Sequence, residues 1–172
     1  MTEASQKTIL VVDDEEDVRQ FLSIALIEAG FKVITANEGA EALAKVKEQK
    51  PDLIPLDLVM PEHSGAKFYH KMSKNKEWAK IPILIVTGHA RDDLGKADLK
   101  DLTMSGPGIY LEKPVKPNNY IAAIKKLLGM DATVEETAVA EKVTLESEVK
   151  NLVDDADVET LKKIKEALKK KK

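Results

Sequence analysis

The stretch TILVVDDEE, residues 8–16, passes from a run of aliphatic and β-branched residues directly into a run of acids. The first part has the length and composition of a buried strand, and the acids stand where that strand would end. Apolar residues then recur at three- and four-residue spacing over residues 16–29, and Gly30 follows as a helix C-cap. The stretch therefore predicts a buried strand, an acidic carboxyl end and a helix directly after it.

The same alternation continues along the chain. Further strands are expected at residues 32–36, 53–58, 81–87 and 108–111. Further helices are expected at residues 40–48, 66–72, 91–104 and 118–128. Three of the strands are apolar on both faces, as in a parallel sheet that helices cover on both sides. We therefore predict an α/β domain with a doubly wound, five-stranded parallel sheet of (βα)5 type, which places ligands at the carboxyl ends of its strands.

Composition and charge narrow the function classes. The 172 residues include 27 Lys+Arg and 30 Asp+Glu, a net charge of −3, which argues against a general nucleic-acid binder. Cysteine is absent, which excludes thiolate metal sites, and three histidines leave little material for a histidine-rich one. The longest apolar run, residues 81–86, is strand-sized and contains Pro82, so we expect neither a signal peptide nor a membrane span. These features predict a cytoplasmic protein.

The character of the sequence changes after Gly129. We interpret residues 1–130 as the α/β domain, residues 131–143 as a linker and residues 144–172 as a helical extension without aromatic residues, glycine or proline. Two apolar stripes within residues 144–168 favour an α-hairpin that serves association, because isolated helices this short need a partner surface. The alternative is a partly disordered tail, which the high charge of the segment favours.

Acidic residues follow two of the predicted strands. Asp13 and Asp14 end the first strand, and Asp57 ends the third. The carboxyl ends of parallel strands meet at one edge of a sheet, so these carboxylates are expected to converge and to need a positive charge between them. Mg²⁺, which takes carboxylates, a carbonyl and waters, would supply it. The alternative is that the acids after the first strand only cap the next helix.

Two further polar groups follow the fourth and fifth strands. Thr87 ends the fourth strand, and the pair Lys113-Pro114 follows the fifth. The expected site therefore combines carboxylates, a hydroxyl and an ammonium at the ends of four strands. Each residue alone is uninformative, but the set in this order is specific.

Residues 8–128 resemble the receiver domain of two-component response regulators, which has a flavodoxin-like fold. The landmarks are Asp13, Asp14, Asp57, Thr87 and Lys113-Pro114, together with Met60-Pro61 and Gly65. The resemblance implies that Asp57 is the phosphoacceptor and that Asp13, Asp14, Asp57 and the Val59 carbonyl hold Mg²⁺. It also implies that Thr87 and Lys113 contact the phosphoryl oxygens and that Tyr110 is the switch aromatic. His89, two residues beyond Thr87, is a candidate modulator of dephosphorylation.

The resemblance implies a receiver that stands alone apart from its short helical extension. It would take a phosphoryl group from a histidine kinase or a phosphotransfer protein and signal by contact with a downstream protein or a second copy of itself. No enzymatic activity is expected beyond Mg²⁺-dependent self-phosphorylation and autodephosphorylation at Asp57. A phosphorylation-independent adaptor or scaffold is the alternative. DNA binding is disfavoured because the segment after Gly129 is short and acidic, and a phosphohydrolase because Val59 stands where its second acid would be.

The sequence departs from the family pattern at three places. Pro55 lies inside the third strand, where a backbone N–H is normally needed, and predicts a local irregularity. Gly88 stands where the family usually has alanine. The segment from Thr87 to Lys113 is longer than usual, and the extra length is expected in the turn-rich residues 103–108.

Overall fold

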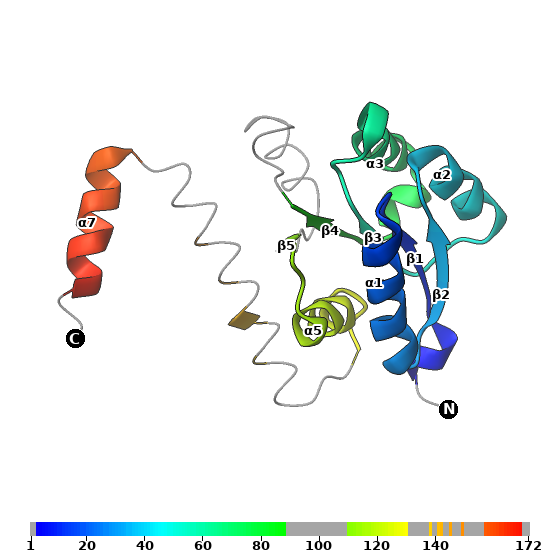
Figure 1. Cartoon of the computed structure of the whole chain (residues 1–172), viewed down its shortest axis with the longest axis horizontal. Coiled ribbons are helices and arrows are strands. Elements are labelled where there is room, and N and C mark those ends of the chain that lie inside the picture. Colours follow the sequence, from blue (N-terminus) through cyan, green and yellow to red (C-terminus); the bar gives the residue numbers. More distant parts are fainter. Residues whose placement is uncertain are drawn as a thin grey trace.

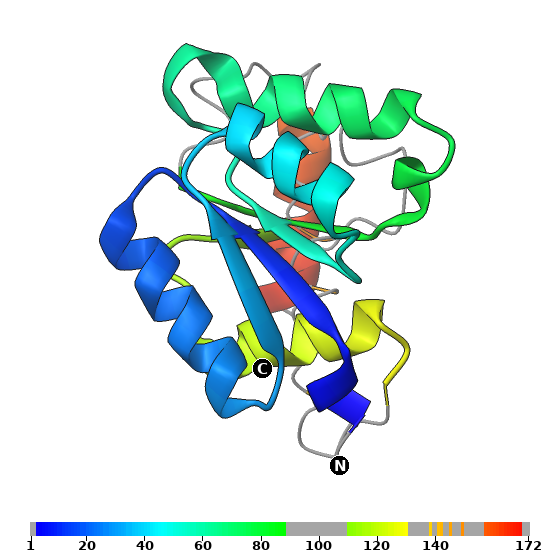
Figure 2. The same ribbon diagram turned by 90° about the vertical axis from the view of Figure 1, so that its right-hand side faces the viewer.

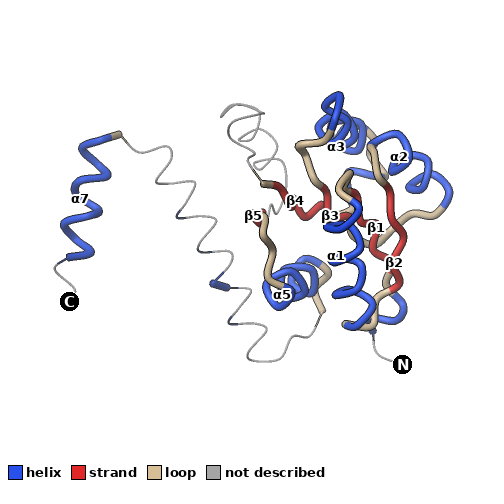
Figure 3. Tube along the Cα trace, in the orientation of Figure 1, coloured by secondary structure: helices blue, strands red, loops and turns tan. Residues whose placement is uncertain are grey.

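The computed structural model describes residues 3–88, 110–130 and 157–169, together with single positions at 138, 141, 142, 145 and 149. Five parallel strands form one sheet in the order β2-β1-β3-β4-β5 (Figures 1 and 3). The strands are β1 (Thr8–Val12), β2 (Lys32–Ala36), β3 (Ile54–Leu56), β4 (Ile83–Thr87) and β5 (Tyr110–Glu112). The predicted doubly wound parallel sheet is confirmed.

Helices cover both faces of this sheet. They are α1 (Glu16–Glu28), α2 (Gly39–Glu48), α3 (Ser64–Lys74) and α5 (Pro117–Leu127), with 3₁₀ turns at Glu3–Gln6, Pro61–His63 and Trp78–Lys80. Figure 2 shows α1 and α5 on one side of the sheet and α2 and α3 on the other. Each side has its own apolar cluster, one built on residues of α1 and α5 and one on residues of α2 and α3. Every residue of β1 is buried, as expected for a strand between two helical layers.

The third strand is shorter than its apolar run. Residues 53–58 are all buried, but regular pairing covers Ile54–Leu56 alone. Toward β1, Val12 pairs with Leu56, and an isolated bridge joins Ile9 to Leu53. Pro55 lies between these two pairs and has no N–H to donate, so the irregularity predicted from its position is present. Toward β4 the pairing is continuous.

Several expected elements lie outside the described residues. These are the helix at residues 91–104, the long connection at residues 103–108 and most of the first half of the proposed hairpin. The second half contains helix α7 (Val158–Lys169), so the C-terminal extension is helical in its described part. The linker boundaries and the hairpin stay predictions. Among the helices of the described residues, none has the length and apolar character needed to cross a bilayer.

Candidate functional site

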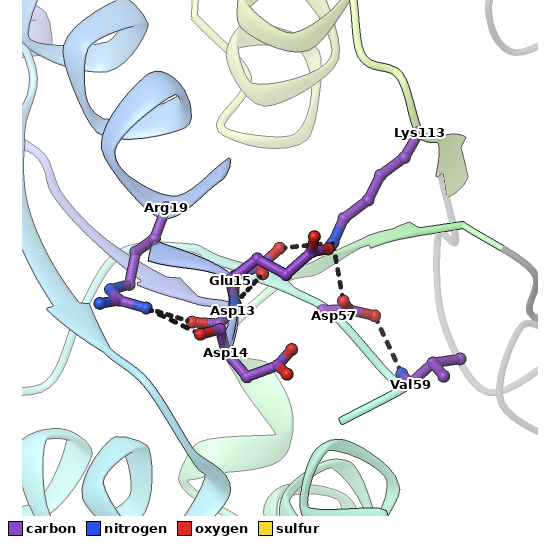
Figure 4. Close-up of polar contacts among 7 residues, drawn as sticks. All are labelled: Asp13, Asp14, Glu15, Arg19, Asp57, Val59 and Lys113. Atoms are coloured by element: carbon purple, nitrogen blue, oxygen red, sulfur yellow. Dashed lines mark hydrogen bonds and ion pairs between the residues drawn. The ribbon is translucent and has the colours of Figure 1, made fainter. Parts of the chain in front are cut away.

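The carboxyl ends of four strands bring their polar residues to one edge of the sheet. Asp13 follows β1, Asp57 follows β3, Thr87 ends β4 and Lys113 follows β5. The strand order places β3 between β1 and β4, so Asp57 lies at the centre of this group. Figure 4 shows the carboxylates and the lysine converging on that position.

Three aspartates form the acidic part of the site. One carboxylate oxygen from each of Asp13, Asp14 and Asp57 lies within 4.8 Å of the other two. Asp13 and Asp57 are buried, whereas Asp14 is exposed. The cluster is thus open to solvent on one side and held in the domain on the other.

Lys113 forms ion pairs with Asp13, Glu15 and Asp57. Its Nζ atom lies 2.8 Å from Asp57 Oδ2, 2.9 Å from Asp13 Oδ2 and 3.0 Å from Glu15 Oε1. The lysine side chain is largely buried, so the contacts to Asp57 and Asp13 are made where solvent screens them little. The Glu15 side chain is largely exposed and adds a weaker contact from the rim.

Local backbone hydrogen bonds aim the two buried carboxylates. The Glu15 N–H donates to Asp13 Oδ1 at 2.9 Å, and the Val59 N–H donates to Asp57 Oδ1 at 2.9 Å. Both are Asx-type contacts two residues along the chain, which aspartate favours at the end of a strand. Each carboxylate therefore uses one oxygen for its own loop and offers the other to Lys113.

The guanidinium of Arg19 fixes the loop between β1 and α1. It donates to the Asp13 carbonyl at 2.8 Å and to the Asp14 carbonyl at 3.4 Å (Figure 4). Arg19 thereby binds the backbone of the acidic loop, while Lys113 binds its carboxylates.

Burial and charge act against each other in this site. Burial raises the pKa of Asp13 above its ordinary value, although Lys113 and the Glu15 N–H act in the opposite direction. Burial alone would lower the pKa of Lys113, but hydrogen bonds to Asp57, Asp13 and Glu15 raise it instead. Lys113 is therefore an ammonium at neutral pH, and its single charge does not fully offset the desolvation of Asp13.

Thr87 contributes a buried hydroxyl. Its side chain is fully buried, and its Oγ1 has no hydrogen-bond partner within the part of the chain that the structure describes. Its backbone carbonyl accepts from the Lys113 N–H at 3.0 Å, which ties the ends of β4 and β5 together. Burial of a hydroxyl without a hydrogen-bond partner costs free energy. A ligand oxygen near Asp57 could accept a hydrogen bond from the Thr87 hydroxyl and remove this cost.

Gly65 sets how closely α3 approaches the loop after β3. A Cβ atom at this position would lie 2.2 Å from the carbonyl oxygen of Asp57 and 2.8 Å from that of Leu58. No side chain fits there, because both neighbours are backbone atoms. The glycine thus lets the start of α3 support the segment that carries Asp57.

The structure brings together the residues that the sequence placed in the site: Asp13, Asp14, Asp57, Thr87 and Lys113. Val59 contributes its N–H, and Tyr110 is half-buried against the apolar cluster of α2 and α3. His89 lies outside the described residues, so its modulatory role stays a prediction. The sequence did not predict the ion pair of Glu15 with Lys113 or the hydrogen bonds of Arg19 to the backbone of the acidic loop. The one feature of the sequence that pointed to either residue was its position close to Asp13 and Asp14.

The donor set fits a hard divalent cation. Carboxylate oxygens are the ligands that Mg²⁺ prefers, and one exposed and two buried aspartates allow it to keep several waters. Burial is the main cause of the raised pKa of Asp13, and the neighbouring Asp57 carboxylate adds to it. A cation beside Asp14 would lower the pKa of Asp13 and complete the charge balance of the site.

Comparison with known proteins agrees with this geometry. The family model for the response regulator receiver domain matches residues 9–125. The chain therefore belongs to the response regulator receiver domain family.

Several relatives share this domain. DivK, a polar-differentiation response regulator of Brucella anthropi, is 34% identical over 124 residues, which cover 72% of this chain and 97% of DivK. PhoB, the phosphate regulon transcriptional regulatory protein of Pseudomonas aeruginosa, is 33% identical over 71% of this chain and 52% of PhoB. The chain thus spans almost all of the first relative and about half of the second.

Solved structures show the same fold. The chemotaxis response regulator CheY4 of Vibrio cholerae is 30% identical, with a TM-score of 0.60 over 70% of this chain and 98% of that one. A CheY-like receiver domain protein from Methanospirillum hungatei is 27% identical, with a TM-score of 0.62 over 72% of this chain and 94% of that one. The receiver accounts for the α/β domain and leaves α7 outside the match.

Proposed function

We propose that the protein accepts a phosphoryl group on Asp57 and passes the change of state to a protein partner. The observation that carries this proposal is the position of Asp57: a buried carboxylate at the central strand end, 2.8 Å from the Lys113 ammonium and within 4.8 Å of two further aspartates. The Lys113 ammonium is already in place to offset the negative charge of a phosphoryl group that is transferred to Asp57.

The chemistry follows from these contacts. Asp57 attacks phosphorus through one carboxylate oxygen, while the bond from phosphorus to the leaving group of the donor breaks. The Lys113 ammonium offsets charge on the phosphoryl oxygens, and the Thr87 hydroxyl donates to one of them, so catalysis is positioning and electrostatics. Mg²⁺ held by Asp13, Asp14, Asp57 and the Val59 carbonyl would supply further positive charge on those oxygens.

The same contacts would couple phosphorylation of Asp57 to a conformational change at Thr87 and Tyr110. A phosphoryl oxygen that draws Thr87 inward leaves space beside β4, and Tyr110 on the neighbouring strand β5 then turns toward it. Ile85 of β4 pairs with Tyr110, and Thr87 pairs with Glu112, so the two strands are already in register for this coupling. The result is a two-state element that a local change in charge biases.

The proposal extends to the phosphoryl donor, the output and the location of the protein. The donor is a phosphohistidine on a histidine kinase or a phosphotransfer protein, and the output is contact with a downstream protein rather than with DNA. We propose a cytoplasmic protein whose chemistry is limited to its own phosphorylation and autodephosphorylation at Asp57. The relatives whose names mark them as transcriptional regulators are about twice the length of the matched region.

Intact mass spectrometry tests the proposal. The full chain is incubated with acetyl phosphate and Mg²⁺, and we expect a gain of one phosphoryl group. Asp57→Asn, which keeps shape and removes the nucleophile, should show no gain. Asp52→Asn is the matched control, since Asp52 precedes the same strand but binds Lys7, 3.0 Å away.

Two outcomes would contradict the proposal. A phosphoryl group that appears equally in the Asp57→Asn chain would place the acceptor elsewhere. A wild-type chain that gains none, while Mg²⁺ binds and the fold is intact by circular dichroism, would favour the phosphorylation-independent adaptor.

A further inference from the structure

Helix α1 presents an apolar face to solvent. Phe21, Ile24 and Ile27 are 47%, 55% and 60% exposed, whereas Leu22 and Leu26 on the opposite side are buried in the core. Among the described residues up to Met130, these three are all the large hydrophobic side chains that are exposed. Their spacing of three residues puts them along one side of the helix. We call Phe21, Ile24 and Ile27 the α1 face.

The α1 face has an acidic border. Asp17 lies four residues before Phe21, and Glu28 lies four residues after Ile24, so both stand on the same side of the helix and both are exposed. The one basic residue of α1, Arg19, instead binds the carbonyls of the acidic loop. The partner that fits this surface is therefore an apolar stripe with basic flanks.

Helix α7 has that chemistry. Val158 is 69% exposed, and Leu161 follows it one turn later. The sequence continues the spacing with Ile164 and Leu168. Lys162 and Lys165 are exposed beside this stripe, whereas Lys163 faces away from it and pairs with Glu159 at 3.3 Å. The sequence ends in Lys169–Lys172. Stripe and flanks are complementary in both polarity and charge to the α1 face.

The chain leaves the domain beside α1. Helix α5 contacts α1, and Leu127, Leu128 and Met130 pack on the apolar cluster to which α1 belongs. At about 3.3 Å per residue, the segment between Met130 and Asp157 is long enough to bring α7 back to its neighbour. A tethered segment has a high effective concentration at a surface within its reach, which favours the same chain over a second copy.

We infer that α7 docks on the α1 face of its own chain, with Val158 and Leu161 against Phe21, Ile24 and Ile27 and with Lys162 and Lys165 toward Asp17 and Glu28. Docking of α7 on α1 would bury both apolar faces. A helix of this length is marginal alone in water and is stabilised by such a surface. The inference does not depend on phosphorylation of Asp57.

Paramagnetic relaxation in the full chain tests this contact. The sequence has no cysteine, so Lys163→Cys, on the side of α7 away from the apolar stripe, carries a single nitroxide label. Isotope-labelled, spin-labelled chain is diluted into an excess of unlabelled wild-type chain, so only a label on the same molecule is detected. We expect several-fold loss of signal for the amides of α1 and unchanged signals for α2, which lies on the other side of the sheet.

A charge placed in the α1 face gives the matched comparison. Ile24→Asp should restore the α1 signals, because it puts a carboxylate into the apolar contact at an exposed position that tolerates it. Ala44→Asp, an exposed change on α2, should leave the signal loss in place, and circular dichroism checks that both variants are folded.

Three results would overturn the inference. The first is α1 signals that the label does not affect in the wild-type background. The second is signal loss that survives Ile24→Asp. The third is loss that appears only when the label sits on the unlabelled chain, which would make a second copy the occupant.

Discussion

The ammonium of Lys113 lies 2.8 Å from Asp57 Oδ2, and this ion pair is largely enclosed by the domain. The same ammonium lies 2.9 Å from Asp13, so one lysine serves two buried carboxylates. A buried ion pair is weak evidence for stability, but removal of one partner leaves the others uncompensated. Lys113 is therefore expected to be both a phosphoryl contact and a condition for stable folding of the site.

Lys113→Met should destabilise the domain, because Asp13 and Asp57 lose their cation. Breaking such a pair typically costs on the order of 3 kcal/mol. Burial already raises the pKa of Asp13, and loss of Lys113 should raise it further. Because the pKa of Asp13 is raised in the folded state, its contribution to stability is fully present below its pKa in the unfolded chain and is lost as pH rises through its pKa in the folded state. The loss of stability in Lys113→Met should therefore shrink as pH falls to about 4.

Urea unfolding at several pH values measures this deficit. The control is Lys116→Met, which removes an exposed lysine three residues away and should change stability little. Mg²⁺ should recover part of the loss in the Lys113 variant, since it brings positive charge to the same carboxylates. A deficit that stays constant from pH 7 to about pH 4 would show that the carboxylates are not its source.

Asp14→Ala should weaken Mg²⁺ binding, because it removes the one exposed carboxylate of the cluster. We expect a loss of about tenfold or more in affinity, the size seen when a supporting group of a metal site is removed. Phosphorylation by acetyl phosphate should fail in parallel. Isothermal titration measures the affinity, and Asp17→Ala, which removes an exposed acid outside the cluster, is the control; equal affinities in the two variants would refute the assigned site.

Much of the site could be predicted from the sequence because parallel strands end at one edge. Once Asp13, Asp57, Thr87 and Lys113 each follow a buried strand, the topology alone brings them together. The contact of Glu15 with Lys113 could not be predicted in this way. It joins residues far apart in the chain through two flexible side chains, and no local pattern specifies such a contact.

The limits of the strands were less predictable than their order. The apolar run at residues 53–58 indicates burial, which is correct, but pairing depends on backbone donors as well. Pro55 has no N–H to donate, and the pairing toward β1 is interrupted between Leu53 and Leu56. The sequence indicated Gly65 only through the resemblance to the family. Glycine is needed there because α3 approaches the Asp57 carbonyl closely, and no local sequence pattern shows that approach.

Gly65→Ala should destabilise the domain although alanine favours helices. A Cβ atom 2.2 Å from the Asp57 carbonyl oxygen forces backbone to move, and such overpacking typically costs about 1–3 kcal/mol. The matched comparison is Gly88→Ala, where a Cβ atom meets none of the described residues within 4 Å and stability should change by less than about 0.5 kcal/mol. Thermal unfolding of both variants decides the matter, and similar losses in the two would contradict the steric argument.

Thr87→Val should separate stability from signalling. The Thr87 hydroxyl is buried and has no partner among the described residues, so an isosteric methyl group removes a desolvated group without breaking a bond. We expect the free energy of unfolding to stay within about 1 kcal/mol of wild type or to rise. The phosphorylated variant should nevertheless lack the hydrogen bond that draws residue 87 toward the phosphoryl group.

Chemical-shift changes at Tyr110 on phosphorylation report that second effect. Wild type and Thr87→Ser, which keeps the hydroxyl, should show them, and Thr87→Val should show much smaller ones at the same extent of phosphorylation. Tyr110 pairs with Ile85 across β4 and β5, so it responds to movement at the end of β4 and not to charge alone. Equal shifts in all three proteins would mean that Tyr110 is moved by another route, and the coupling through the Thr87 hydroxyl would then be wrong.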